Sequence, residues 1–146
     1  MKKIFLSFIV LTILFILFAC KPEETWEDNS PTFSHEFGEM FGKKGSIGII
    51  GSKMMFNYEQ KWMWHFWGTE EISYKEWEVK AFKEGNEKAI NPIIFKDEKL
   101  YPRGDEINGH ARTKMYFPSP GLWKLKVYID DEFFDEIIVN IENTKG

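Results

Sequence analysis

The residues best suited to binding chemistry form a block of aromatic side chains around one histidine, near the middle of the chain. Successive residues of a β-strand point to opposite faces, so a strand here would carry large side chains on both sides. One face would hold Trp62, Trp64 and Phe66, and the other Met63, His65 and Trp67. A half-buried strand is normally apolar on one face only, so the second face must be covered or must bind something.

Two explanations of the second apolar face stay open. The block is either a central strand whose other face lies under a loop such as residues 32–45, or an exposed aromatic platform for a glycan, a peptide or a protein partner. We expect the even-numbered face to be core, because it has no polar group to satisfy and His65 does need a partner. His65 should then be partly accessible or hydrogen-bonded near the surface, with Trp67 beside it. The candidate ligand-binding residues are Trp64, His65 and Trp67.

The other residue combinations give weaker support for a metal site or a catalytic site. The remaining histidines, His35 and His110, stand at no metal-ligand spacing relative to His65. An acidic cluster near the C-terminus lacks the glycine that a calcium loop needs for its sharp turn. That cluster comprises Asp130, Asp131, Glu132, Asp135 and Glu136. The chain also has no Gly-x-Ser-x-Gly elbow, so we expect no catalytic residues, no metal and no cofactor.

The only cysteine, Cys20, closes an apolar run that starts at Ile4 and follows two lysines at positions 2 and 3. The run is shorter than the roughly 20 residues of a spanning helix, and this layout is typical of a secretory signal peptide. With a cysteine at its end it resembles a lipoprotein signal. That resemblance implies cleavage after Ala19 and lipidation of Cys20. Residues 1–19 would then be the signal peptide, and a two-chain, palmitate-type anchor would hold the protein stably on the extracytoplasmic face of the cell membrane.

Charge and length limit what the mature chain can do. Loss of the two N-terminal lysines changes the formal charge from −4 to −6 (−4 − 2), and no dense Lys/Arg stretch remains, so nucleic acid is excluded as a partner. The 127 remaining residues (146 − 19) suit one domain and a tether, and we expect a monomer. Residues 20–45 are expected to be a lipidated tether and linker. The stretch up to Pro31 is expected to be mobile, because Trp26 is the only large apolar residue in it. Residues 32–45 are expected to be loop or edge material packed against the domain.

Short alternating segments predict β-strands from Ser46 onward, with glycine, proline and acidic turns between them. The predicted strands cover residues 46–50, 54–56, 61–67, 76–82, 90–95, 110–117, 122–130 and 133–141. The segment 122–130 alternates most strictly, with Trp123 directed inward and Lys124 outward. No long amphipathic helix is predicted. Residues 46–146 should therefore form an all-β, antiparallel β-sandwich.

Two blocks of sequence resemble a lipoprotein family of unknown function from Bacillus-type bacteria. The first is Trp64-His65-Phe66-Trp67-Gly68, and the second runs from Pro120 through Leu125 and continues as Val127-Tyr128-Ile129. The resemblance extends over about residues 46–141. It implies an immunoglobulin-like sandwich on a Gram-positive cell surface, and it brings no known activity.

These observations lead to two hypotheses of function. In the first, the protein is a cell-surface lipoprotein that acts as a non-catalytic binding or interaction module for an envelope protein or polymer, such as a glycan. In the second, it is a small-ligand or metal-binding lipoprotein that uses the aromatic and histidine block at residues 62–67.

Overall fold

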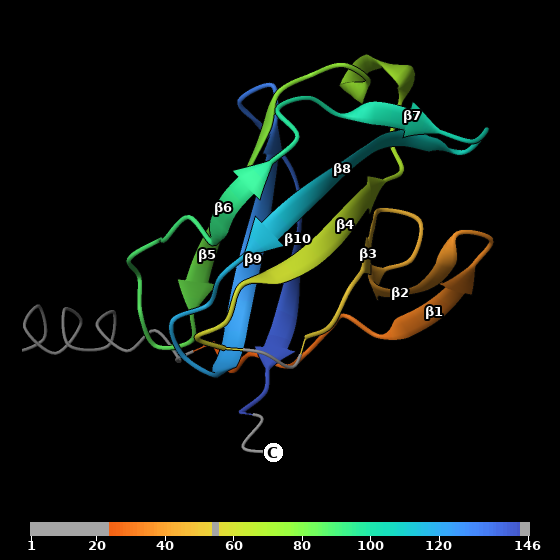
Figure 1. Ribbon diagram of the computed structural model, residues 1–146. Helices are drawn as coiled ribbons and strands as arrows, with labels where there is room; N and C mark the ends of the chain where they lie inside the picture. The colour runs from red at the N-terminus through yellow and green to blue at the C-terminus, as the bar shows by residue number, and fades with distance from the viewer. Residues whose placement is uncertain (1–23, 54–55, 144–146) are drawn as a thin grey trace, which may run out of the picture.

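The structure is a computed structural model that describes residues 24–53 and 56–143, and these residues form ten strands in two antiparallel sheets (Figure 1). The larger sheet has the order β1-β2-β3-β4-β8-β6, and β7 also pairs with β8. Its strands are β1 (Thr32–His35), β2 (Gly38–Lys43), β3 (Ile47–Ile50), β4 (Gln60–Phe66), β6 (Ile93–Lys96), β7 (Tyr101–Arg103) and β8 (Ile107–Met115). The smaller sheet has the order β10-β9-β5, from strands β10 (Glu132–Ile141), β9 (Gly121–Ile129) and β5 (Trp77–Lys83). A short 3-10 helix, η1 (Glu70–Ile72), precedes β5.

The two sheets face each other as layers, and the alternating residues of each bury one face in a common core. In Figure 1, β9 and β10 run behind β4 and β8. On β9 the inward residues, Trp123, Leu125, Val127 and Ile129, are all buried, as their alternation predicts. Strands β9 and β10 meet at a tight turn where Asp130 and Asp131 have φ values of 52° and 64°. This left-handed pair is what a two-residue hairpin requires.

The all-β, antiparallel sandwich expected from the sequence is confirmed. Strands β3, β4, β5, β8, β9 and β10 fall within a few residues of the predicted segments. The second predicted segment, at residues 54–56, has Met54 and Met55 outside the described residues. The sequence did not reveal β7, whose three residues include Pro102.

The N-terminal part of the folded region is more ordered than expected. Strands β1 and β2 form a hairpin that extends the larger sheet back to Thr32, so the sheet begins before the boundary expected at Ser46. The preceding segment lies along the free edge of β10. The Asn29 N–H donates to the Ile138 carbonyl (3.2 Å), and the Ile138 N–H donates to Asn29 Oδ1 (2.6 Å).

Asp28 and Ser30 secure the same segment. Asp28 Oδ2 accepts hydrogen bonds from the Asn140 N–H and from Lys53 Nζ, both at 3.1 Å. Asp28 Oδ1 accepts from the Ser30 N–H at 2.9 Å, and Ser30 is fully buried. For residues 28–31 the expectation of a mobile chain is therefore wrong, because backbone and carboxylate hydrogen bonds compensate there for the scarcity of apolar groups.

The signal peptide at residues 1–19 and the lipidation site Cys20 lie outside the described residues. Among the residues that are described, no helix is long and apolar enough to cross a membrane.

Candidate functional site

The aromatic block on β4 is built into the core through its even-numbered face. Trp62, Trp64 and Phe66 are each at most 1% exposed, and they pack on one another and on Trp77 of β5. The Trp64 indole N–H donates to Thr113 Oγ1 on the neighbouring strand β8 (3.1 Å). Trp64 therefore presents no surface to a ligand, and the expectation that this face is core is confirmed.

The odd-numbered face of β4 lies under the hairpin formed by β1 and β2. Phe33 and Met40 from this hairpin meet Trp67 above Gly48 of β3. A Cβ at Gly48 would lie 2.7 Å from Met40 Sδ and 3.0 Å from atoms of Phe33 and Trp67, so only glycine lets these side chains close over the strand. Of the two explanations for the second apolar face, the covered central strand is correct. Its cover is a β-hairpin of the same sheet.

His65 lies inside this second cluster and is fully buried, so of the two situations expected for it the partly accessible one is wrong, and its ring is instead hydrogen-bonded. Phe37, in the turn of the hairpin, stacks over its ring at 6.4 Å between centroids. His65 Nε2 is 2.7 Å from Arg103 Nη1, and Nδ1 is 3.2 Å from the Gly48 carbonyl. Arginine only donates and a carbonyl only accepts, so these partners assign the neutral ring with its proton on Nδ1.

The surroundings of His65 hold it in that neutral form. The pKa of His65 is lowered to about 4, chiefly by burial and also by the nearby positive charge of Arg103, against the opposing effect of the Gly48 hydrogen bond. The Arg103 guanidinium itself stacks on Phe37 at 4.0 Å from the ring centroid. His65 thus acts as a buried acceptor that positions Arg103 and closes the hairpin onto the sheet.

All three histidines of the chain gather on this face of the larger sheet. His110 stacks on His65 at 6.2 Å between ring centroids, and His35 meets Trp67 edge-on at 5.7 Å. Within the described residues, no three His, Cys, Asp or Glu side chains lie close enough together to hold a metal ion. Of the candidate residues, the structure buries Trp64 and His65 on opposite faces of one strand and leaves Trp67 half-buried.

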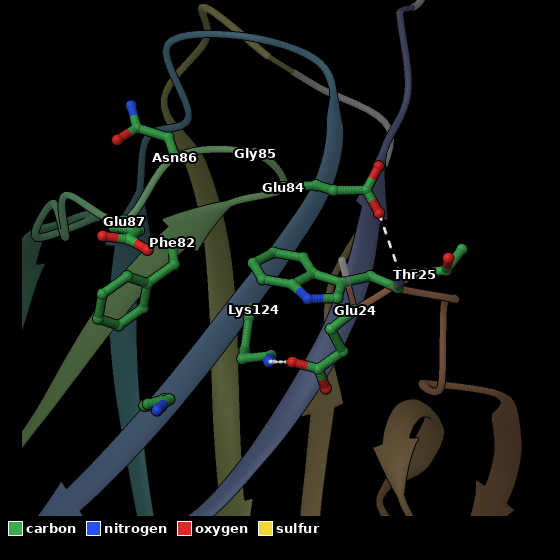
Figure 2. Close-up of a pocket in the computed structure, with 10 residues that line it drawn as sticks. Glu24, Thr25, Phe82, Glu84, Gly85, Asn86, Glu87 and Lys124 are labelled. Carbon is green, nitrogen blue, oxygen red and sulfur yellow. Dashed lines mark hydrogen bonds and ion pairs between the residues drawn. The ribbon is translucent and has the colours of Figure 1, made fainter. Parts of the chain in front are cut away.

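A pocket of about 770 Å³ lies elsewhere, on the outer face of the smaller sheet, and we call it the Trp26 pocket (Figure 2). The segment before Asp28 forms one wall, and strands β5 and β9 with the loop after β5 form the rest. Its lining residues are Glu24, Thr25, Trp26, Phe82, Glu84, Gly85, Asn86, Glu87, Lys124 and Lys126. The pocket therefore brings together three stretches of chain that lie far apart in the sequence.

Aromatic rings and charged groups alternate around the Trp26 pocket. The Lys124 ammonium lies 4.4 Å from the Trp26 ring centroid and 3.5 Å from Glu24 Oε2, an ion pair that Figure 2 shows. The Trp26 backbone N–H donates to Glu84 Oε2 (3.2 Å) and so ties the segment to the opposite wall. Lys126 lies over the Phe82 ring, 5.5 Å from its centroid. The arrangement can bind a ligand that has both apolar faces and charged or hydroxyl groups.

Sequence reasoning missed this site because its parts meet only through tertiary structure. Phe82 and Lys124 are paired across β5 and β9, but neither stands out in its own strand. The one available signal was Trp26, a large aromatic residue in an otherwise polar and proline-containing segment.

No curated protein matches the chain. A solved structure, described as the crystal structure of a "Putative Lipoprotein from Bacillus anthracis", superposes with a TM-score of 0.63 at 24% sequence identity. The match covers 88% of this chain and 92% of that one, and it shows a shared fold.

A family model matches residues 18–139, which is most of the chain. The family is described as a domain of unknown function, DUF4871. The resemblance to a family of unknown function is thereby confirmed, and the Bacillus lipoprotein is a structural neighbour, while the immunoglobulin-like topology stays a prediction. The chain belongs to the DUF4871 family.

Proposed function

We propose that this protein is a lipid-anchored, non-catalytic binding module on the extracytoplasmic face of the membrane, and that it holds a segment of an envelope polymer in the Trp26 pocket. The observation that carries this proposal is the pocket itself. Its volume of about 770 Å³ falls within the range of roughly 300–1,000 Å³ typical of ligand sites. The anchor is supported by the signal-like N-terminus with its single cysteine.

The lining of the pocket suits a polyhydroxylated polymer better than a purely apolar ligand. Trp26 and Phe82 offer flat rings on which the apolar face of a sugar or polyol can pack. Glu84, Asn86 and Glu87 provide acceptors and donors for hydroxyl groups along one rim.

Binding without catalysis is favoured by the setting of the carboxylates. Glu24, Glu84 and Glu87 are exposed, whereas general acids and bases work best when burial and neighbours tune them. His65, whose pKa is lowered to about 4, is buried under the β1–β2 hairpin and does not line the Trp26 pocket. The alternative site at residues 62–67 finds no support, because Trp64 and His65 are fully buried.

The proposal is tested by co-sedimentation of the mature chain, carrying Cys20→Ser to remove the lipid, with purified insoluble envelope polymer. We expect Trp26→Ala to weaken binding tenfold or more, because truncating an aromatic anchor costs about 2 kcal/mol. Tyr58→Ala is the matched control, since Tyr58 is 58% exposed and lines a different, smaller pocket.

Equal binding by the Trp26→Ala and Tyr58→Ala variants would show that the polymer does not bind in the Trp26 pocket. Absence of polymer binding would contradict the proposed function. If protease treatment of the polymer preparation abolishes binding, the partner is a protein. That result would contradict the proposal of a polymer ligand.

A further inference from the structure

We propose that the ligand is an uncharged glycan chain, and that it extends from the Trp26 pocket along the outer face of the smaller sheet as far as Phe133. We call this strip of surface the aromatic track, and it comprises Trp26, Phe82, Tyr128 and Phe133. The inference rests on the proposed function, because it assigns the chemical class and the extent of the polymer segment that the same pocket holds.

The strand register places the rings of the aromatic track in two rows across the sheet. In the first row, Phe82 of β5 stands opposite Lys124 of β9, and Trp26 lies over Lys124. In the second row, Tyr128 of β9 stands opposite Phe133 of β10. Positions 124 and 128 of one strand are about 13 Å apart, so the two rows can contact separate units of one extended chain.

The far end of the aromatic track is an exposed ring. Phe133 is 54% exposed, and it meets the half-buried Tyr128 ring edge-on at 5.9 Å between centroids. The next residue, Phe134, instead packs on Phe66 of the core, at 5.7 Å between centroids. Phe133 and Tyr128 therefore offer a flat apolar surface on the outside of the sheet, of the kind on which the apolar face of a sugar packs.

Charged side chains fill the row between the two aromatic rows. Lys80 and Lys126 stand opposite each other across β5 and β9. The Lys126 ammonium lies 5.5 Å from the Phe82 ring centroid, and the Lys80 ammonium lies 4.7 Å from the Tyr128 ring centroid. Rings that alternate with hydrogen-bond donors suit a ligand whose units have apolar faces and hydroxyl groups at their edges.

The charges of the pocket disfavour a polyanion. Carboxylates outnumber ammonium groups in the lining by three, Glu24, Glu84 and Glu87, to two, Lys124 and Lys126. The Lys124 ammonium is already paired with Glu24 Oε2 at 3.5 Å. An anionic chain would therefore meet more repulsion than attraction at this end of the aromatic track.

The lysines beside the rings disfavour a cationic chain as well. A lysine ammonium already lies over each of the Trp26, Phe82 and Tyr128 rings, at 4.4, 5.5 and 4.7 Å from the respective centroids. A ligand ammonium stacked on the same rings would meet like charge at close range. An uncharged, hydroxylated chain meets neither obstacle, and it is the chemistry that fits this surface.

The test measures by calorimetry how tightly the mature Cys20→Ser chain binds two uncharged oligosaccharides, chitobiose and chitohexaose. We expect chitohexaose to bind about tenfold more tightly, because a disaccharide is too short to contact both rows of rings. Phe133→Ala should weaken chitohexaose binding about fivefold and leave chitobiose binding unchanged. Phe95→Ala is the matched control, because Phe95 is 56% exposed and lies on β6 of the other sheet, and it should leave both affinities unchanged.

Equal affinity for the two oligosaccharides, or equal losses with Phe133→Ala and Phe95→Ala, would overturn the aromatic track. Tighter binding of dextran sulfate than of chitohexaose would show a preference for polyanions and would overturn the uncharged ligand. Trp26-dependent sedimentation with envelope polymer, without binding of either oligosaccharide, would overturn this inference and leave the proposed function standing. Failure of the sedimentation assay as well would overturn both.

Discussion

At the scale of single residues, His65 has an unexpected role. A histidine on the second face of an aromatic strand could mark a ligand site, but here it is sealed by Phe37 and hydrogen-bonded to Arg103 and Gly48. The contact with Arg103 requires the neutral ring, since a proton on Nε2 would face the donors of Arg103. His65 therefore makes stability depend on pH.

The pKa of His65 sets the direction of this dependence. Burial lowers it from 6.5 to about 4, so between these values the unfolded chain binds a proton that the folded chain does not. The stabilisation is complete above about pH 6.5 and is lost progressively as the pH falls to 4, by about 3 kcal/mol in total. We expect urea unfolding to show this loss in the wild type and not in His65→Gln.

The same variant should lose about 1–3 kcal/mol at pH 7, because it disturbs a buried acceptor. His110→Gln is the control, since it leaves the contacts of His65 to Arg103 and Gly48 in place. Hydrogen bonds and ion pairs lower the pKa values of Asp28, Asp97 and Asp135. Their effect on stability therefore changes at a lower pH than the effect of His65. Stability curves of wild type and His65→Gln that run parallel from pH 7 to pH 4 would disprove the role assigned to His65.

Residue types alone could predict one face of β4 and not the other. Trp62, Trp64 and Phe66 are large and mainly apolar, and one buried acceptor satisfies each indole N–H, so their burial follows from chemistry. The burial of His65 depends on a hairpin about thirty residues earlier folding over Gly48. No local pattern encodes that approach.

At the scale of elements, the N-terminal segment differs most from what the sequence predicts. Its composition is that of a mobile tether, yet Asp28 organises four hydrogen-bond partners around one carboxylate. Burial alone would raise the pKa of Asp28, but these hydrogen bonds outweigh it and lower the pKa. Composition cannot predict this, because the partners at Lys53 and Asn140 come from distant parts of the chain.

We expect Asp28→Ala to lower the free energy of unfolding by about 1–3 kcal/mol, since it leaves Ser30 and the Asn140 N–H without their acceptor. Limited proteolysis of this variant should then cut between residues 24 and 31 before any other site. Glu27→Ala, at an exposed neighbouring position, should stay within about 0.5 kcal/mol of wild type. Equal protease resistance of wild type and Asp28→Ala would mean that the carboxylate does not secure the segment.

Strand β9 shows what the alternation of apolar and polar residues can and cannot predict about burial. The inward row headed by Trp123 is buried as expected. Lys124 does point to the outer face, but its side chain is only 13% exposed because Trp26 covers it. Alternation assigns a residue to a face, and it cannot say whether another segment crosses that face. The Trp26 pocket exists because the N-terminal segment crosses the outer face of β9.

At the scale of the whole molecule, the anchor, the segment and the pocket form one continuous arrangement. A segment fixed from Asp28 onward leaves few residues between Cys20 and the domain, so the proposed lipid anchor would hold the domain near the lipid surface. We expect Cys20→Ser to move the protein from the membrane pellet to the soluble extracytoplasmic fraction in cell fractionation. Retention of this variant in the pellet after a high-salt wash would contradict the lipid anchor.

The central claim is that the Trp26 pocket is occupied by envelope material in the living cell. The most direct measurement places a photo-crosslinking phenylalanine analogue at Phe82, inside the pocket, and the same analogue at the exposed Tyr58 as control. After irradiation of intact cells, we predict a mass-shifted adduct at position 82 that polymer- or lipid-degrading enzymes remove, and none at position 58. Absence of an adduct at position 82, or equal adducts at both positions, would contradict the claim.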